Sequence, residues 1–121
     1  MGSDSSVTMH ISPIDAPMAS VMQLEGIRFS YSYDMENDSD PQYRLGLVAQ
    51  DVERVVPEAV KEMEDHLKAV AYSDMVPLLI EAMKEQQLQI DSLQVSLMEQ
   101  EEQINRIKNR RWFKKKTFEQ K

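Results

Sequence analysis

Residues 73–110, SDMVPLLIEAMKEQQLQIDSLQVSLMEQEEQINRIKNR, decide the architecture that we predict for this chain. The stretch contains no glycine, and its one proline, Pro77, falls in the first turn, where the missing N–H is tolerated. Leucine, glutamate, glutamine and lysine are abundant, so the sequence favours one uninterrupted helix capped by Ser73 or Asp74. Its apolar residues recur at alternating steps of three and four, which is typical of a coiled-coil seam. The a positions are Val76, Met83, Ile90, Leu97, Ile104 and Arg111, and the d positions are Leu79, Gln86, Leu93, Gln100 and Ile107.

This helix needs partners. At 1.5 Å per residue it is on the order of 50 Å long, and a monomer would leave its seam facing water over several turns. Copies of the same chain are the simplest partners. Gln86 and Gln100 weaken the seam and can fix its register and strand number. Isoleucine at a with leucine at d favours two strands, but the methionine and glutamine positions dilute that preference, so the heptads leave dimer and trimer open.

The residues before the helix predict a small α+β head. A helix is expected over residues 15–24, capped by Asp15 and ended by Gly26, and an alternating strand over 27–33. An acidic loop (34–42), a strand (43–48), a helical segment (49–56) and a hairpin (59–63 with 67–71) follow, and His66 in its turn receives no role. We therefore divide the chain into a linker (1–10), the head (11–72), the coiled-coil helix (73–110) and a basic tail (111–121).

Composition excludes several classes of site. The chain has 121 residues, of which 41% are hydrophobic, and it contains no cysteine and two histidines, His10 and His66. Disulfides, thiolate chemistry and the usual zinc clusters are therefore not expected, and we predict no cofactor, no metal and no small-molecule substrate. No apolar run approaches the length that a membrane span requires, and the N-terminus does not resemble a signal peptide.

Charge is distributed unevenly. Residues 1–105 carry 6 Lys and Arg against 20 Asp and Glu, whereas residues 106–121 carry 8 against 1. A basic tail of this kind can bind nucleic acid or an anionic membrane surface. The interpretation that we favour is that the tail complements the dipole at the C-terminal end of the helix. Nucleic acid and membrane are accordingly not among the partners that we expect.

Two stretches carry a family resemblance. Residues 46–60, GLVAQDVERVVPEAV, closely resemble the GxIAQEVExxxPExV signature of the endosialidase-type C-terminal intramolecular chaperone domains. Residues 70–85, VAYSDMVPLLIEAMKE, are similar to the VxYxxLxxLLIEAIKE start of the long helix in that family. The motif positions that match are Gly46, Ala49, Gln50, Asp51, Val52, Glu53, Pro57, Glu58 and Tyr72. The resemblance extends from Ile11 into the coiled coil.

The resemblance implies a function. Family members occur at the C-termini of phage tailspikes, tail fibres and neck appendages, and within the myelin regulatory factor of animals. They form homotrimers and guide assembly of the elongated protein upstream. The resemblance implies three strands for the seam of this chain, and head contacts around Gln50, Val52 and Tyr72. It also implies two partners, which are further copies of the chain and its own upstream part. It also implies a location in the host cytoplasm during assembly, or on the virion when the domain is not released.

Many family members also release themselves through a serine nucleophile and a lysine base five residues later. The register of the match places Ser3 on the serine and Thr8 on the lysine. A threonine hydroxyl does not act as a general base at neutral pH, and His10, the nearest alternative, has no orienting partner in the sequence. We therefore expect the dyad to be inactive. An active self-cleaving peptidase stays an alternative function, and a nucleic-acid-binding coiled coil is ranked below it because the acidic body repels phosphate.

Overall fold

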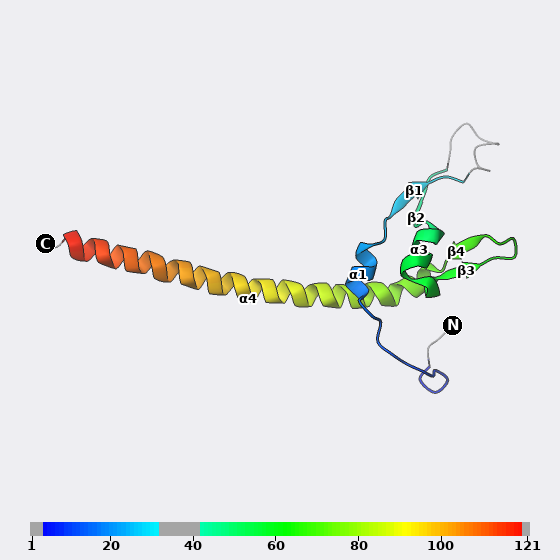
Figure 1. Ribbon diagram of the computed structural model, residues 1–121, viewed down its shortest axis with the longest axis horizontal. Helices are drawn as coiled ribbons and strands as arrows, with labels where there is room; N and C mark the ends of the chain where they lie inside the picture. Colours follow the sequence, from blue (N-terminus) through cyan, green and yellow to red (C-terminus); the bar gives the residue numbers. More distant parts are fainter. Residues whose placement is uncertain (1–3, 32–41, 120–121) are drawn as a thin grey trace. The chain divides into compact units, whose positions relative to one another are not determined.

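The computed structural model describes residues 4–31 and 42–119. The chain divides into two compact units, Met1–Met83 and Lys84–Lys121. Short antiparallel strands and small helices come first, and a long C-terminal helix follows (Figure 1). The predicted α+β class is therefore confirmed.

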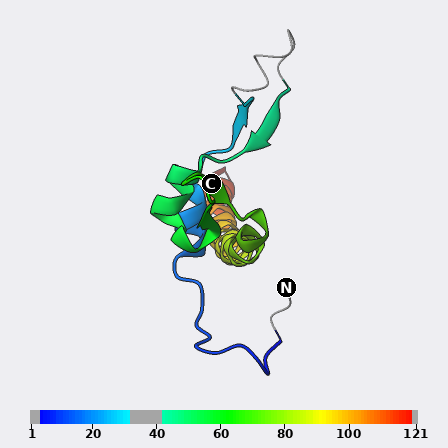
Figure 2. The same cartoon turned by 90° about the vertical axis from the view of Figure 1, so that its right-hand side faces the viewer.

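Among the described residues, the first unit contains seven short elements and the start of the long helix. The elements are α1 (Pro17–Met22), β1 (Ile27–Phe29), β2 (Arg44–Gly46), α3 (Ala49–Val55), the 3-10 helix η1 (Pro57–Ala59), β3 (Val60–Glu62) and β4 (Lys68–Val70). β1 pairs antiparallel with β2, and Ile27 lies opposite Gly46. β3 pairs antiparallel with β4, and Val60 lies opposite Val70. Both views show α3 beside the β3–β4 pair (Figures 1 and 2), in agreement with the contacts between these elements.

Element bounds differ from the predicted ones in understandable ways. α1 begins at Pro17, since proline suits the first helical position, so Ala16 rather than Asp15 is the cap. β1 ends at Phe29, whereas the predicted strand continues to residue 33. Residues 32 and 33 lie outside the described residues, and so does all of the predicted loop 34–42 except Gln42. The predicted helical segment and hairpin are both present, with η1 between them.

The core of the first unit is small. Val52 and Ala59 are fully buried, and Met75 and Leu78 of the long helix complete the cluster. Partly buried apolar side chains surround it, namely Val21, Leu24, Leu47, Val56, Val60 and Val70. α1, α3, η1, β3 and β4 therefore each contribute one side chain to a single cluster, and none of these short elements is stable alone.

The long helix, α4 (Tyr72–Glu119), begins earlier and ends later than the periodicity predicts. Because α4 begins at Tyr72, Ser73 and Asp74 lie within its first turn and neither is its cap, and Pro77 lies inside the helix rather than in the first turn as predicted. The acidic Asp74 interacts favourably with the positive end of the helix dipole. It continues past Arg110 because residues 111–119 contain neither glycine nor proline. The segment that we named a basic tail is therefore helical as far as Glu119.

Candidate functional site

Two motif residues that are far apart in the sequence meet at the start of α4. The backbone N–H of Leu47 donates a hydrogen bond of 2.9 Å to the hydroxyl oxygen of Tyr72. A Cβ atom on Gly46 would lie 2.6 Å from that oxygen and 2.9 Å from Cε1 of Phe29. Such separations are shorter than van der Waals contact, so only glycine fits at position 46 without movement. The resemblance identified Gly46 and Tyr72, but nothing in the sequence indicated that Phe29 lies beside them.

The centre of the motif lies on α3 and supplies the core. Val52 is fully buried, so its role is packing, whereas Gln50 on the same helix is exposed. Pro57 opens η1 and directs the chain so that Ala59 is also fully buried. The carbonyl oxygen of Ala59 then accepts a hydrogen bond of 2.7 Å from the N–H of Ala71, immediately before α4. The motif therefore ties α3, η1 and the start of α4 together.

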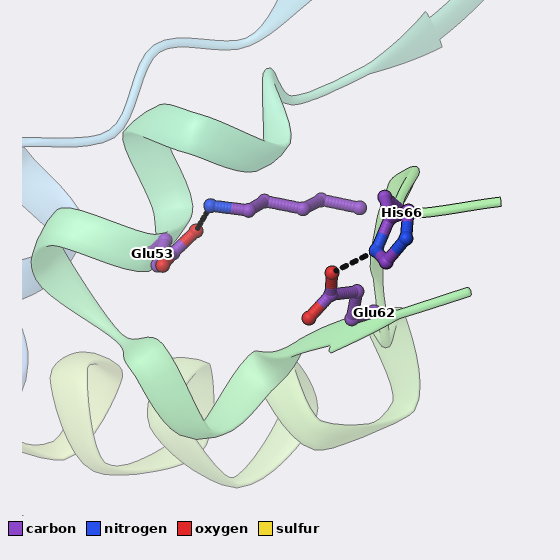
Figure 3. A network of polar contacts seen from close by, with 4 residues as sticks. Glu53, Glu62 and His66 are labelled. Carbon is purple, nitrogen blue, oxygen red and sulfur yellow. Dashed lines mark hydrogen bonds and ion pairs between the residues drawn. The ribbon is translucent and has the colours of Figure 1, made fainter. Parts of the chain in front are cut away.

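Polar motif residues make contacts on the surface of this unit. Nζ of Lys68 on β4 donates to Oε2 of Glu53 on α3 at 2.5 Å, and Asp51 pairs with Arg54 one turn later. Figure 3 shows Glu53 at this contact and the contact between Glu62 and His66. Oε1 of Glu62 lies 3.1 Å from Nδ1 of His66. The hydrogen bond and the negative charge of Glu53 raise the pKa of Lys68. These contacts orient the hairpin against α3 and bring together no set of groups suited to catalysis.

Pro57 and Glu58 also border an open hollow in the first unit. Residues 12–16, which precede α1, form one side of it, and Asp74 and Leu78 of α4 line it as well. Its remaining lining residues are Ser20, Val55 and Val56. The hollow is partly open to solvent, so it is a depression at the motif and not a closed cavity.

The N-terminal segment contains Thr8, which the resemblance is predicted to align with the lysine base of the family. Ser3 lies outside the described residues. Thr8 donates its hydroxyl to the backbone carbonyl oxygen of Asp4 at 2.9 Å, within a tight turn. Oδ1 of Asp4 accepts from the N–H of Ser6 at 2.9 Å and from its hydroxyl at 2.8 Å, and these bonds lower the pKa of Asp4. The hydroxyl of Thr8 is thus engaged in local turn structure.

α4 presents two different apolar faces in its first three turns. Met75, Leu78 and Ala82 are buried in the first unit. In these turns each residue of the predicted seam directly follows one of the buried residues in the sequence. The predicted seam is exposed, and this includes Gln86 and Gln100. The exposed fractions of its eight apolar side chains run from 41% to 68%; they are Val76, Leu79, Met83, Ile90, Leu93, Leu97, Ile104 and Ile107. Sequence reasoning missed the buried face, although it has the same spacing of three and four shifted by one position.

Over residues 4–31 and 42–119, no three His, Cys, Asp or Glu side chains gather where they could hold a metal ion. Within the same residues, no helix combines the length and the apolarity needed to cross a bilayer.

Comparison with known proteins identifies the first half of the chain. No curated protein matches the sequence significantly. The family model described as chaperone of endosialidase matches residues 3–61. The match covers α1, β1, β2, α3 and η1, and therefore the motif from Gly46 to Glu58 that supplies Val52 to the core. The resemblance to the chaperone-of-endosialidase family is therefore confirmed over residues 3–61.

Proposed function

We propose that this chain is a homotrimerising intramolecular chaperone that aligns three copies of the protein upstream of it. The observation that carries the proposal is the exposed seam on α4. Ile90 is 41% exposed and Leu93 is 68% exposed, although both stand at heptad positions whose side chains are buried in coiled coils. Burying one such side chain contributes about 1.5–3 kcal/mol, so association of the seam is strongly favoured.

The small core of the head supports the same proposal. Among the described residues, only five side chains are buried, namely Val52, Ala59, Met75, Leu78 and Ala82. A unit with so little core is marginal alone, and association with further copies is a usual stabiliser. Three of the five lie on α4, so the helix that carries the seam also completes the core of the head. Assembly of the helices and folding of the head are therefore coupled.

Three copies are proposed because the heptad pattern leaves dimer and trimer open, and the family resemblance implies a trimer. The coiled coil is proposed over residues 73–110, with Gln86 and Gln100 fixing the register. The coiled coil raises the effective concentration of the three upstream chains, because tethering them turns a slow three-body encounter into near-intramolecular association. The partners are thus further copies of the chain and its own upstream segment.

The test is the solution mass of the chain and of two matched variants. The wild type is expected to have three times its mass of 14.0 kDa by light scattering. Ile90→Asp places a charge in the seam and is expected to yield monomers. Leu88→Asp makes the same kind of change at an f position, 70% exposed and off the seam, and is expected to leave the mass unchanged. A monomeric wild type at micromolar concentration, or equal dissociation by both variants, would show that the seam does not assemble the chain.

The chaperone role needs a second measurement. The chain is joined to a trimeric β-rich fibre protein, and the yield of native trimer after refolding is compared with and without Ile90→Asp. Assembly by templating predicts a large loss of native fibre with Ile90→Asp and none with Leu88→Asp. An unchanged yield with a monomeric Ile90→Asp domain would separate association from chaperoning and refute the latter.

A further inference from the structure

The last turns of α4 carry a dense positive charge that the helix dipole does not explain. Seven basic residues and no acidic one occur between Arg106 and Lys116. The favourable effect of a cation on the dipole falls off within the last turn of a helix. α4 runs to Glu119, and Lys116 is the basic residue of its last turn. Arg106, Lys108, Arg110 and Arg111 lie too far inside the helix to act this way, so complementing the dipole is an insufficient explanation of the basic segment.

Two exposed aromatic rings lie among these charges. Trp112 is 58% exposed and Phe113 is 70% exposed, and their ring centroids are 6.3 Å apart. Nζ of Lys116 lies 4.6 Å from the centre of the Trp112 ring. Trp112, Phe113, Lys116 and Thr117 together line a shallow hollow. Large apolar rings in water beside a cluster of cations indicate a surface that meets something both apolar and anionic.

The rings do not belong to the seam. At 100° per residue, Trp112 and Phe113 lie about 140° and 240° round the helix from Ile107, the last apolar seam residue. Phe113 borders a second shallow hollow with Arg106, Asn109 and Arg110. The aromatic face is therefore still exposed when the seam is covered. A ligand of this face would be additional to the proposed function and would contact no seam residue.

We infer that residues 106–117 form a docking surface for an anionic lipid bilayer. Tryptophan and phenylalanine enter the boundary between head groups and acyl chains, while the long stems of lysine and arginine let their charges stay at the phosphates. A cluster of four to eight basic residues on a helix is the usual recognition element for anionic lipid. The two rings are sequence neighbours on one turn, whereas stacking of single-stranded nucleic acid uses rings placed along the path of the strand. Lipid therefore fits the arrangement better than nucleic acid.

The experiment uses the intrinsic fluorescence of the whole chain, because Trp112 is its single tryptophan. Vesicles of phosphatidylcholine and phosphatidylserine in a two-to-one ratio are compared with vesicles of phosphatidylcholine alone. The expected result is a blue shift of the Trp112 emission and co-sedimentation with the mixed vesicles only. Added salt is expected to weaken both effects, because screening reduces the attraction between the basic helix and the lipid head groups.

Matched charge variants distinguish binding by residues 106–117 from a general effect of positive charge on the chain. Lys108→Gln/Lys115→Gln removes two charges beside Trp112 without touching Lys116, which contacts the ring. Each charge near an anionic surface changes the affinity roughly fivefold, so this double variant is expected to bind about 25-fold more weakly. The control, Lys61→Gln/Lys84→Gln, removes two charges outside the docking surface and is expected to bind as the wild type does. Light scattering of each variant shows whether its assembly has changed, so failure of the proposed trimer and failure of lipid binding are read separately.

Three results would overturn the inference. The first is an unshifted Trp112 emission with the mixed vesicles at low salt. The second is equal binding to neutral vesicles, and the third is an equal loss of binding in the control variant. A response of Trp112 to a single-stranded oligonucleotide but not to the vesicles would assign the surface to nucleic acid instead.

Discussion

Replacing Gly46 with alanine tests the contact that joins the motif to the start of α4. The backbone of Gly46 does not have a positive φ, so alanine can adopt it without backbone strain. The whole effect of the substitution must therefore come from the new methyl group. That group would lie 2.6 Å from the hydroxyl oxygen of Tyr72 and 2.9 Å from the edge of the Phe29 ring.

The magnitude follows from two opposing terms. Overpacking of this kind costs about 1–3 kcal/mol, and alanine in place of a strand glycine regains about 0.5–1 kcal/mol of chain entropy. We expect Gly46→Ala to lower the free energy of unfolding by about 1–2 kcal/mol. Tyr72→Phe removes the hydrogen bond from the N–H of Leu47, which costs about 0.5–1 kcal/mol because Tyr72 is half exposed.

The two substitutions should not be additive. Without its hydroxyl, the ring at position 72 no longer makes the closer of the two clashes, and the hydrogen bond that the clash would distort is already absent. Gly46→Ala is therefore expected to cost about 0.5–1.5 kcal/mol less in the Tyr72→Phe background than in the wild type. The contact with Phe29 stays in both backgrounds and keeps the residual cost above zero.

Urea unfolding of the four proteins at one chain concentration measures this coupling. The fixed concentration matters because association and folding are proposed to be linked. Full additivity would refute the idea that the hydroxyl of Tyr72 excludes a side chain at position 46. A neutral Gly46→Ala would refute the steric account altogether, and it would leave the glycine of the motif without a structural reason.

Three further outcomes are expected. Val52→Ala removes two carbons from the fully buried side chain of α3 and is expected to lower the free energy of unfolding by about 2–3 kcal/mol in urea titrations. Gln100→Leu is expected to raise the stability of the proposed seam by about 1–2 kcal/mol per chain, seen as a higher melting temperature; a lower one would contradict the heptad assignment. Glu53→Gln is expected to return the raised pKa of Lys68 towards its ordinary value by NMR titration. Because a raised lysine pKa stabilises the fold below the ordinary value, the stability difference between wild type and Glu53→Gln should shrink as pH rises through the pKa of Lys68.

The sequence predicted most of the elements but few of their contacts. Heptad spacing predicted α4, and alternation and proline placement predicted β1, α3 and the β3–β4 pair, because these patterns follow from local geometry. The resemblance selected Gly46 and Tyr72 without saying why they matter. The predicted end of α4 near residue 110 was wrong because a run of charges indicates a tail only weakly, and lysine and arginine are good helix formers.

What the sequence determined by itself is the spacing of the predicted seam, since the positions of Ile90, Leu93 and Leu97 on one helix face follow from helical geometry alone. Only the tertiary structure decided which apolar face of α4 enters the head. Met75 and Leu78 have the same spacing as Val76 and Leu79, so periodicity cannot separate them; packing against Val52 buries one pair and leaves the other exposed. The structure likewise showed Trp112 and Phe113 on a helix away from the seam, because the continuation of α4 fixed their directions.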